Sequence, residues 1–254
     1  MGEVGRRLAG ALERSGWEVR PVTRDAGWSG ALDPDDPAPR LLAVREEDLG
    51  QVLERIPVSL RPRLVLVQNG FLEAVHGPLG PVTRGLIYFT SKGEFYEVLC
   101  PSVFHGPLAA PFVEALGGGG ISSRLATDHR AFLEAMIVKG IWNAVVGLPL
   151  AVHDVDLGTY LESYRDELEA LADESARAAG AEYGVELGGE VAVRKILDTT
   201  SALRRVRGGV KALAWRNGAI ARFGRRHSIP TPVTDRLLRA SDYDPGFDSG
   251  DGGR

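Results

Sequence analysis

A change of pattern near residue 128 constrains the fold of this chain more than any other feature. Before it, short apolar runs alternate with helical segments, which is typical of a parallel sheet built from crossover units. After it, helical periodicity is continuous and is broken mainly by Gly and Pro. We therefore predict an α/β, Rossmann-type domain over 1–127, a helical domain over 128–240, and a Gly- and Asp-rich tail over 241–254 that stays disordered.

The elements follow from periodicity and from helix-breaking residues. An amphipathic helix is expected over 3–15 and ends at Gly16. The further elements expected in the first half are strands at 17–23, 41–44, 64–68 and 121–126, a helix at 46–55, and a strand-rich antiparallel extension over 81–107. The helices expected in the second half are 129–150, 158–180, 190–205 and 208–227.

Composition excludes several classes of protein. The single cysteine, Cys100, cannot form an intramolecular disulfide, and no Cys/His cluster has the spacing of a metal site. A net charge of −4 argues against a general nucleic-acid binder. The N-terminus is unlike a signal peptide, and no run of 18 uncharged apolar residues occurs, so we expect a cytoplasmic protein without a membrane span.

The start of the chain carries part of a dinucleotide-binding motif. Gly2 and Gly5 match the second and third glycines of G-x-G-x-x-G, but the first glycine and the strand before it are absent. Arg24 follows the next predicted strand, where a cation selects the 2′-phosphate of NADP. The alternative is that Arg24 is a solvated loop charge beside Asp25.

Amide side chains follow the predicted strand at 64–68. Gln68 and Asn69 would project from the carboxyl edge of a parallel sheet, where ligands bind in open α/β folds. Asn69-Gly70 is also a common turn dipeptide, because both residues tolerate positive φ. Spacing alone favours the turn.

Lys139 and Asn143 are the most informative polar pair. They lie one helical turn apart in the otherwise apolar segment 136–150. A lysine in such a helix either extends its ammonium outward to solvent or faces a polar cleft. In a cleft it could donate a proton to a developing alkoxide.

The segment 199–234 contains no acidic residue but many arginines. Its positive field could attract an anionic substrate, or it could pair with the acidic helix at 158–180. We favour pairing for most of it. The histidines are dispersed, and no G-x-S-x-G motif indicates a hydrolase.

Several blocks in order resemble the ketopantoate reductase family. They are LAVREEDL at 42–49, LVLVQNGF at 64–71, RGLIYFTSKG at 84–93, SVFHGPLA at 102–109, KGIWN at 139–143 and WRNG at 215–218. The resemblance implies a Rossmann domain that binds NADPH, a helical domain, a small anionic 2-oxo acid substrate and a homodimer.

The resemblance also assigns roles to residues. Gly2 and Gly5 would face the pyrophosphate of NADPH, and Arg24 its 2′-phosphate. Arg45, Gln68 and Asn69 would bind the cofactor, with Arg45 and Asn69 near the nicotinamide. Lys139 would be the general acid and Asn143 would orient the substrate. Thr200 and Ser201 would bind its carboxylate, and Asn217-Gly218 matches a helix marker of the family.

Three departures weaken the match. Ala212 stands where the family has a glutamate, and Gly147 stands where it often has another asparagine. The first strand is missing, so either the natural start lies upstream or the nucleotide domain is compromised. The alternative to an NADPH-dependent reductase is therefore a non-catalytic or repurposed protein of this fold that binds an anionic small molecule.

Overall fold

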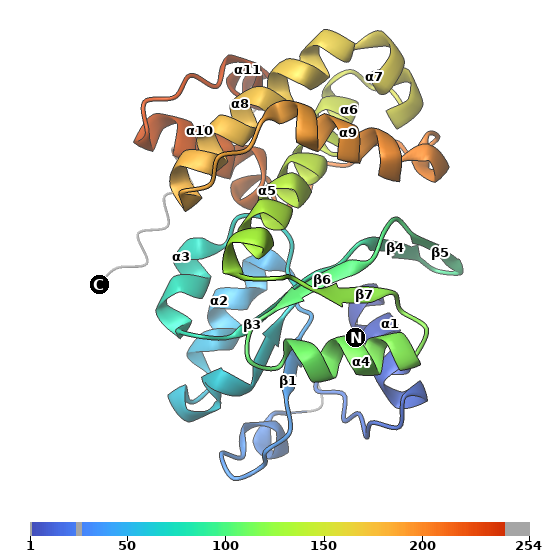
Figure 1. The fold of residues 1–254 in the computed structure, drawn as a ribbon, viewed down its shortest axis with the longest axis vertical. Helices are drawn as coiled ribbons and strands as arrows, with labels where there is room; N and C mark the ends of the chain where they lie inside the picture. The colour runs from blue at the N-terminus through green and yellow to red at the C-terminus, as the bar shows by residue number, and fades with distance from the viewer. Residues whose placement is uncertain (1, 24–26, 242–254) are drawn as a thin grey trace. The chain divides into compact units, whose positions relative to one another are not determined.

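The computed structural model describes residues 2–23 and 27–241, and it divides into two compact units, 1–132 and 133–254 (Figure 1). The first unit is α/β and the second is helical. The expected tail lies outside the described residues apart from its first residue, Ser241. The change of pattern near residue 128 is thus a change of architecture.

A mixed, mostly parallel sheet of five strands forms the centre of the first unit, in the order β1-β2-β3-β6-β7. Only the β3–β6 pair is antiparallel. The strands are β1 (Arg40–Leu42), β2 (Leu64–Leu66), β3 (Thr83–Leu86), β6 (Ser102–His105) and β7 (Ser123–Leu125). All three residues of β2 are buried, as expected for a strand covered on both faces.

The strand predicted at 17–23 is wrong, since these residues belong to no strand. Among the described residues β1 is the edge strand of the sheet, with no neighbour on its outer side. A strand needs a hydrogen-bonded neighbour, and none of the described residues forms the strand that would separate 17–23 from β1 in a dinucleotide fold. Trp17 and Val19 instead pack against the core, with the Trp17 ring 5.2 Å from that of Phe112.

The predicted antiparallel extension of the sheet over 81–107 is correct only in part. β3 runs parallel to β2, and β6 returns antiparallel to β3. Between them β4 (Phe89–Lys92) and β5 (Phe95–Val98) form a separate two-stranded hairpin. Sequence periodicity identifies such strands but not which neighbours they pair with.

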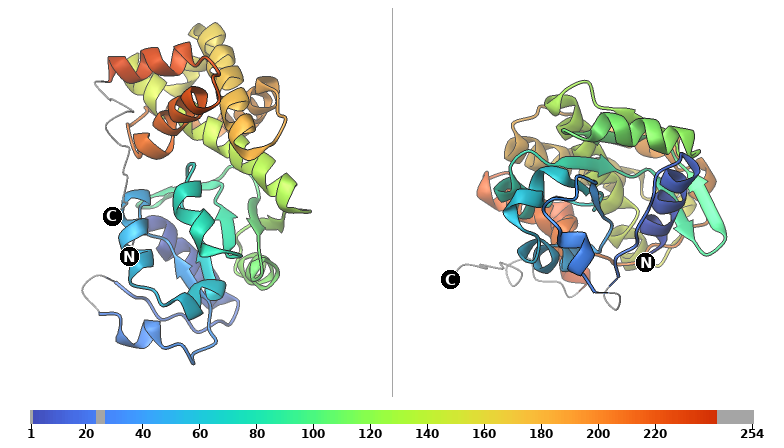
Figure 2. Two further views of the ribbon diagram at one scale, coloured as in Figure 1. Left: turned by 90° about the vertical axis from the view of Figure 1, so that its left-hand side faces the viewer. Right: turned by 90° about the horizontal axis from the view of Figure 1, so that it is seen from below.

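Helices α1 (Glu3–Arg14) and α4 (Ala109–Gly118) lie side by side against the sheet (Figures 1 and 2). α1 buries Leu8 and Leu12, as predicted, and ends at Arg14, with the chain turning at Gly16, whose φ is +90°. At the end of α4 a Cβ on Gly119 would overlap the Ala11 backbone, so glycine is required for this close approach. α2 (Glu46–Glu54) and the short α3 (Glu73–His76) complete the unit.

The second unit is helical, as predicted, with more interruptions than periodicity indicated. Its helices are α5 (His129–Val145), which begins in the first unit, α6 (Leu148–Val152), α7 (Leu157–Ser163), α8 (Arg165–Tyr183), α9 (Gly189–Thr199), α10 (Asn217–Arg226) and α11 (Pro232–Ala240). The helices predicted over 190–205 and 208–227 are too long. The first ends at Thr199, and the second begins only at Asn217, because Gly208, Gly209 and the left-handed Ala212 (φ 49°) interrupt it.

One segment, 129–152, is long and apolar enough to cross a membrane by length and composition. It comprises α5 and α6 with a break at Gly147, and most of it is buried inside the protein. Burial of this kind is typical of a core helix in a soluble protein.

Candidate functional site

Three of the predicted site residues meet at the carboxyl edge of β1 and β2. The Gln68 side chain is buried, and its Nε2 donates to the carbonyl oxygens of Leu42 (2.7 Å) and Val44 (3.2 Å). The backbone N–H of Asn69 donates to the Glu46 carboxylate, 3.1 Å away, at the start of α2. Because β1 and β2 are parallel, the loops that follow them bring Arg45, Gln68 and Asn69 together.

Gln68 has an unused acceptor, and Asn69 lies at a turn. The buried Gln68 Oε1 has no hydrogen-bond partner, so this oxygen could accept a hydrogen bond from a ligand. Gly70 has a φ of +94°, which makes Asn69-Gly70 a bend in the backbone as well as an end of the strand. The turn and the ligand-facing interpretations are therefore compatible.

Arg45 is exposed and paired with acids. Its Nε donates to Asp48 (3.1 Å), and its Nη1 lies 3.0 Å from Glu47. The hydrogen bond to Asp48, and the charges of Asp48 and Glu47, raise the pKa of the Arg45 guanidinium. A cofactor phosphate or carboxylate would have to compete with these partners.

The N-terminus of α1 is open. Gly2 is its N-cap, no side chain caps the helix, and a Cβ on Gly2 would meet nothing within 4 Å. Gly5 is buried in the first turns. Glu3 would oppose a phosphate here, but its carboxylate turns to Arg6 (3.6 Å) and Ser91 (3.3 Å). Arg24 lies outside the described residues.

On α5, Lys139 and Asn143 are both buried, each with 5% of its surface exposed. Lys139 Nζ lies 4.4 Å from the centroid of the Trp142 ring, a cation–π contact. Asn143 Nδ2 is buried without a hydrogen-bond partner. Since an unsatisfied buried amide costs free energy, this donor is suited to a ligand acceptor.

The other predicted residues of the helical unit have structural contacts. Thr200 is buried, and its hydroxyl donates to the Ile196 carbonyl of α9. Ser201 begins a short 3-10 turn, and its side chain lies outside what the structure describes. Asn217 is buried at the start of α10, and its Nδ2 contacts the Ala144 carbonyl of α5 at 3.4 Å. Asn217 therefore lies next to the α5 turn that carries Asn143, whereas the Thr200 hydroxyl bonds within α9.

Two of the departures from the family pattern have structural correlates. A Cβ on Gly147 would lie 3.2 Å from the Asn143 carbonyl oxygen, and one on Gly208 would lie 2.5 Å from the Gly147 oxygen. The backbones approach so closely here that a side chain at 147 would be crowded. Ala212 adopts the left-handed conformation just before a 3-10 turn and supplies no carboxylate.

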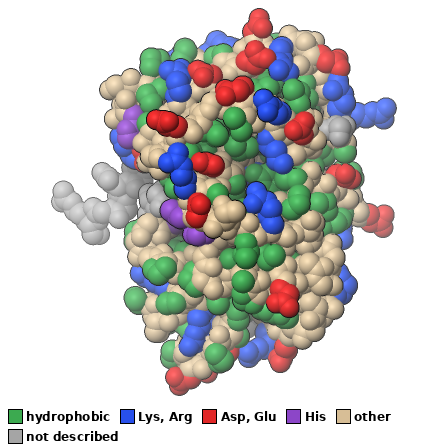
Figure 3. Space-filling view, in the orientation of Figure 1, with side chains coloured by type: hydrophobic (Ala, Val, Ile, Leu, Met, Phe, Trp, Pro, Cys, Tyr) green, Lys and Arg blue, Asp and Glu red, His purple; other side chains and the backbone are tan. Residues whose placement is uncertain are grey.

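Three arginines of the basic stretch 199–234 pair with acids. Arg204 pairs with Glu162, Arg207 with Asp154 (2.7 Å), and Arg226 with Glu182. Figure 3 accordingly shows blue and red side chains interspersed over the helical unit. The predicted pairing therefore accounts for these three arginines rather than for most of the stretch, and of the three pairs only that of Arg204 with Glu162 lies on the acidic segment 158–180.

Two observations fit a nicotinamide dinucleotide: the open N-terminus of α1, and the unpartnered Gln68 Oε1 just after β2. Backbone N–H groups at a helix N-terminus bind phosphate, and a buried amide oxygen suits a carboxamide donor. Within 2–23 and 27–241, no group of three or more His, Cys, Asp or Glu could hold a metal ion.

Sequence reasoning missed two groups of residues. Trp142 lies three residues after Lys139, so helical spacing could have placed the two together. Arg7 and Arg14 lie seven residues apart on one face of α1 and line a pocket with Tyr96. The seven-residue spacing of the two arginines is visible in the sequence, whereas the approach of Tyr96 to them depends on the tertiary fold.

Comparison with solved structures gives strong similarity of fold at low sequence identity. D-mandelate dehydrogenase, in a ternary structure with NADH and anilino(oxo)acetate, aligns with a TM-score of 0.73 at 15% identity and 95% coverage of both chains. A ketopantoate reductase from Ralstonia eutropha JMP134 gives 0.71 at 19% identity and 94% coverage of both. The 2-dehydropantoate 2-reductase of Geobacter metallireducens GS-15 gives 0.71 at 14% identity, covering 95% of this chain and 97% of that one.

No protein-family model matches the sequence, and no curated protein matches it. The similarity is therefore carried by structure. The mostly parallel sheet, the helical second unit and the near-complete coverage of both chains all support the same fold assignment. The chain has the ketopantoate reductase fold, which D-mandelate dehydrogenase shares.

Proposed function

We propose that this protein is an NADPH-dependent reductase of a small 2-oxo acid, in which Lys139 is the general acid. The observation that supports this most is the α5 pair: a buried lysine one turn from a buried asparagine whose amide donor has no partner. The fold is shared by a dehydrogenase whose structure contains NADH and an oxoacetate.

The residues of α5 suit the reduction of a ketone. NADPH, when bound, supplies a hydride to the carbonyl carbon, and negative charge then develops on the carbonyl oxygen. Lys139 donates a proton from Nζ to that oxygen, which gives the hydroxyl of the product. Asn143 donates a hydrogen bond from Nδ2 to a substrate oxygen. The Trp142 ring stabilises the ammonium before the proton leaves.

The α/β unit would hold the cofactor. The open N-terminus of α1, with Gly2 and Gly5, would bind the pyrophosphate, and Arg24 would select the 2′-phosphate of NADPH. Gln68 and Asn69 would contact the nicotinamide half, with Arg45 nearby. Thr200 and Ser201 would bind the substrate carboxylate once the Thr200 hydroxyl rotates away from Ile196. A ketopantoate reductase from Staphylococcus aureus is described as dimeric, which supports a homodimer here.

The test is NADPH oxidation by the purified protein with a panel of small 2-oxo acids, followed by identification of the 2-hydroxy acid product. We expect at least one oxo acid to give sustained oxidation with one hydroxy acid formed per NADPH consumed. Oxidation without product, or none across the panel, would contradict the proposal.

The alternative is a protein of the same fold that binds an anionic small molecule without reduction. Two observations favour it. Among the described residues β1 is the edge strand of the sheet, whereas the sheet of a dinucleotide fold has further strands beyond this position, and Ala212 supplies no carboxylate. A protein that binds 2-oxo acids but leaves NADPH unoxidised would establish this alternative.

A further inference from the structure

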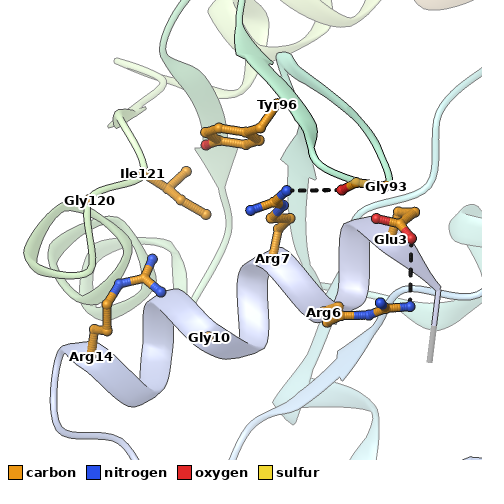
Figure 4. A pocket seen from close by; sticks show the side chains of 9 residues that line it. All are labelled: Glu3, Arg6, Arg7, Gly10, Arg14, Gly93, Tyr96, Gly120 and Ile121. Atoms are coloured by element: carbon orange, nitrogen blue, oxygen red, sulfur yellow. Dashed lines mark hydrogen bonds and ion pairs between the residues drawn. The ribbon is translucent and has the colours of Figure 1, made fainter.

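A pocket with a volume of about 340 Å³ lies in the α/β unit, between α1, the β4–β5 hairpin and the turn after α4 (Figure 4). None of its residues has a role in the function proposed above. The lining residues are Glu3, Arg6, Arg7, Gly10, Arg14, Gly93, Tyr96, Gly120 and Ile121. The volume is in the range of small-molecule sites.

Two guanidinium groups in this pocket have only neutral partners among the described residues. Arg7 donates from Nε to Ser91 Oγ (3.2 Å) and from Nη2 to the Gly93 carbonyl (3.3 Å). Arg14 donates from Nε and Nη2 to the Gly119 carbonyl, at 3.0 and 2.6 Å. The Nη1 group of each is left to bind something else. Arg6, by contrast, lies 3.6 Å from the Glu3 carboxylate.

Tyr96 adds a third donor. Its hydroxyl oxygen is buried and has no hydrogen-bond partner. The Arg7 guanidinium lies 4.8 Å from the centroid of the ring. Burial raises the pKa of Tyr96, while the charges of Arg7 and Arg14 oppose the rise, so both cations act on this hydroxyl. Figure 4 shows the two guanidinium groups on the side of α1 that faces Tyr96 and Ile121.

Gly10 keeps the floor of the pocket open. It lies in the middle of α1, where glycine weakens a helix relative to alanine. Packing does not demand glycine here, since a Cβ would meet only Arg14 Nη1, at 3.4 Å. A side chain at this position would occupy the space between Arg7 and Arg14.

We propose that this pocket binds the phosphate group of a small phosphate monoester, at a site separate from that of the reductase. Two guanidinium groups and a hydroxyl offer several donors to one group, and a phosphate dianion has the charge and the acceptor oxygens to receive them. Ile121 and the Tyr96 ring provide an apolar wall for the organic part. The 2′-phosphate of NADPH has the same chemistry, so the test must separate the two sources.

The experiment is calorimetric titration of the full chain with glycerol phosphate. We compare the unchanged protein with Arg7→Gln/Arg14→Gln, with Gly10→Leu, which fills the pocket but keeps both charges, and with Arg225→Gln/Arg239→Gln. The last variant removes the same charge from exposed positions of α10 and α11. Thermal melting checks that each variant is folded.

We expect saturable binding by the unchanged protein and by the Arg225/Arg239 control. The affinity should fall at least tenfold in each pocket variant, since hydrogen bonds to charged groups are lost or blocked. No binding by the unchanged protein would overturn the proposal, and so would unchanged affinity in either folded pocket variant. A variant that fails to fold is replaced by Arg14→Gln alone, to which the same criteria apply.

Competition then identifies the source of the phosphate. Glycerol phosphate binding that persists at saturating NADPH supports a separate ligand. Binding lost with NADPH but kept with NADH would overturn the separate site, because the 2′-phosphate of the cofactor would then be the occupant. This result does not depend on any reductase activity, so the two proposals can fail independently.

Discussion

Glu167 in the helical unit and the two arginines Arg7 and Arg14 in the α/β unit differ in how their charges are satisfied. Glu167 of α8 accepts from His153 (2.9 Å), Tyr160 (3.0 Å) and Arg236 (2.6 Å), and so joins α8 to three other parts of the helical unit. In the α/β unit, Arg7 and Arg14 contact only neutral groups among the described residues. Charges that are satisfied internally hold a fold together, whereas charges without a counter-ion are available to a ligand.

The same comparison can be made inside the helical unit. Glu174 of α8 is buried and accepts three hydrogen bonds from the start of α11, two from backbone amides and one from the Thr234 hydroxyl. Asn143 of α5 is equally buried, and its amide donor has no partner. One group therefore stabilises the fold, and the other is suited to a substrate.

The largest effect is expected on α5. Lys139→Ala should lower the turnover of oxo acid by about 10²–10⁴, the usual range for loss of a general acid, with folding and NADPH affinity largely retained. The control is Lys195→Ala on α9, which should keep turnover within about twofold. Steady-state rates and thermal melting check both. Equal turnover in the two variants would remove Lys139 from the mechanism.

Glu174→Ala tests the buried carboxylate whose hydrogen bonds are all made within the protein. It leaves the Val233 and Thr234 amides and the Thr234 hydroxyl without their acceptor. The free energy of unfolding should fall by about 2–4 kcal/mol, measured by denaturant titration. Glu169→Ala on the same helix loses only an exposed pair with Arg165 and should cost no more than about 0.5 kcal/mol. Similar losses of unfolding free energy in the two variants would show that the buried hydrogen bonds of Glu174 stabilise the protein no more than the exposed Glu169–Arg165 pair does.

His76 provides a pH-dependent test in the α/β unit. Burial, and secondarily the charge of Arg84, lower its pKa from 6.5 to about 3, and neither ring nitrogen has a hydrogen-bond partner. Below pH 6.5 the unfolded chain therefore binds a proton that the folded chain does not, so stability falls with pH down to about 3. The contribution is about 2 kcal/mol between pH 7 and pH 5.

The measurement is denaturant unfolding of the unchanged protein and of His76→Phe at these two pH values. The phenyl ring keeps the buried volume and cannot titrate. We expect the variant to lose about 2 kcal/mol less on acidification. Equal losses would mean that His76 is protonated in the folded protein.

The last pair of variants tests stability at the contact of α1 with α4, which lies next to the pocket lined by Arg7, Arg14 and Tyr96. Gly119→Ala should destabilise the protein by about 1–3 kcal/mol, because its Cβ would overlap the Ala11 backbone. Gly118→Ala is the matched control: its Cβ would make an ordinary contact with Ser15 at 3.5 Å and should be neutral or stabilising by up to about 1 kcal/mol. Thermal melting of the pair checks this, and the reverse order would contradict the described packing.

The sequence predicts the parts of this molecule that depend on local patterns. Apolar periodicity and the glycine at position 16 predict α1, and the structure gives Gly16 the positive φ that suits a turn. Helical spacing puts Lys139 and Asn143 on one face, and both are buried. The missing first strand is visible in the sequence, but strand pairing is non-local, so the β-type pattern of 17–23 still led to a strand that the structure does not form. The pocket was missed because Tyr96 and Gly93 come from a hairpin more than 70 residues after α1.

The most direct test of the central claim is titration of the chain with NADPH, followed by nicotinamide fluorescence, with NADH as the control. The account predicts saturable binding that is tighter for NADPH than for NADH, since the open start of α1 and the sheet edge beside Gln68 would hold the dinucleotide and Arg24 would recognise its 2′-phosphate. Binding of neither nucleotide would contradict it, and the fold would then serve another purpose.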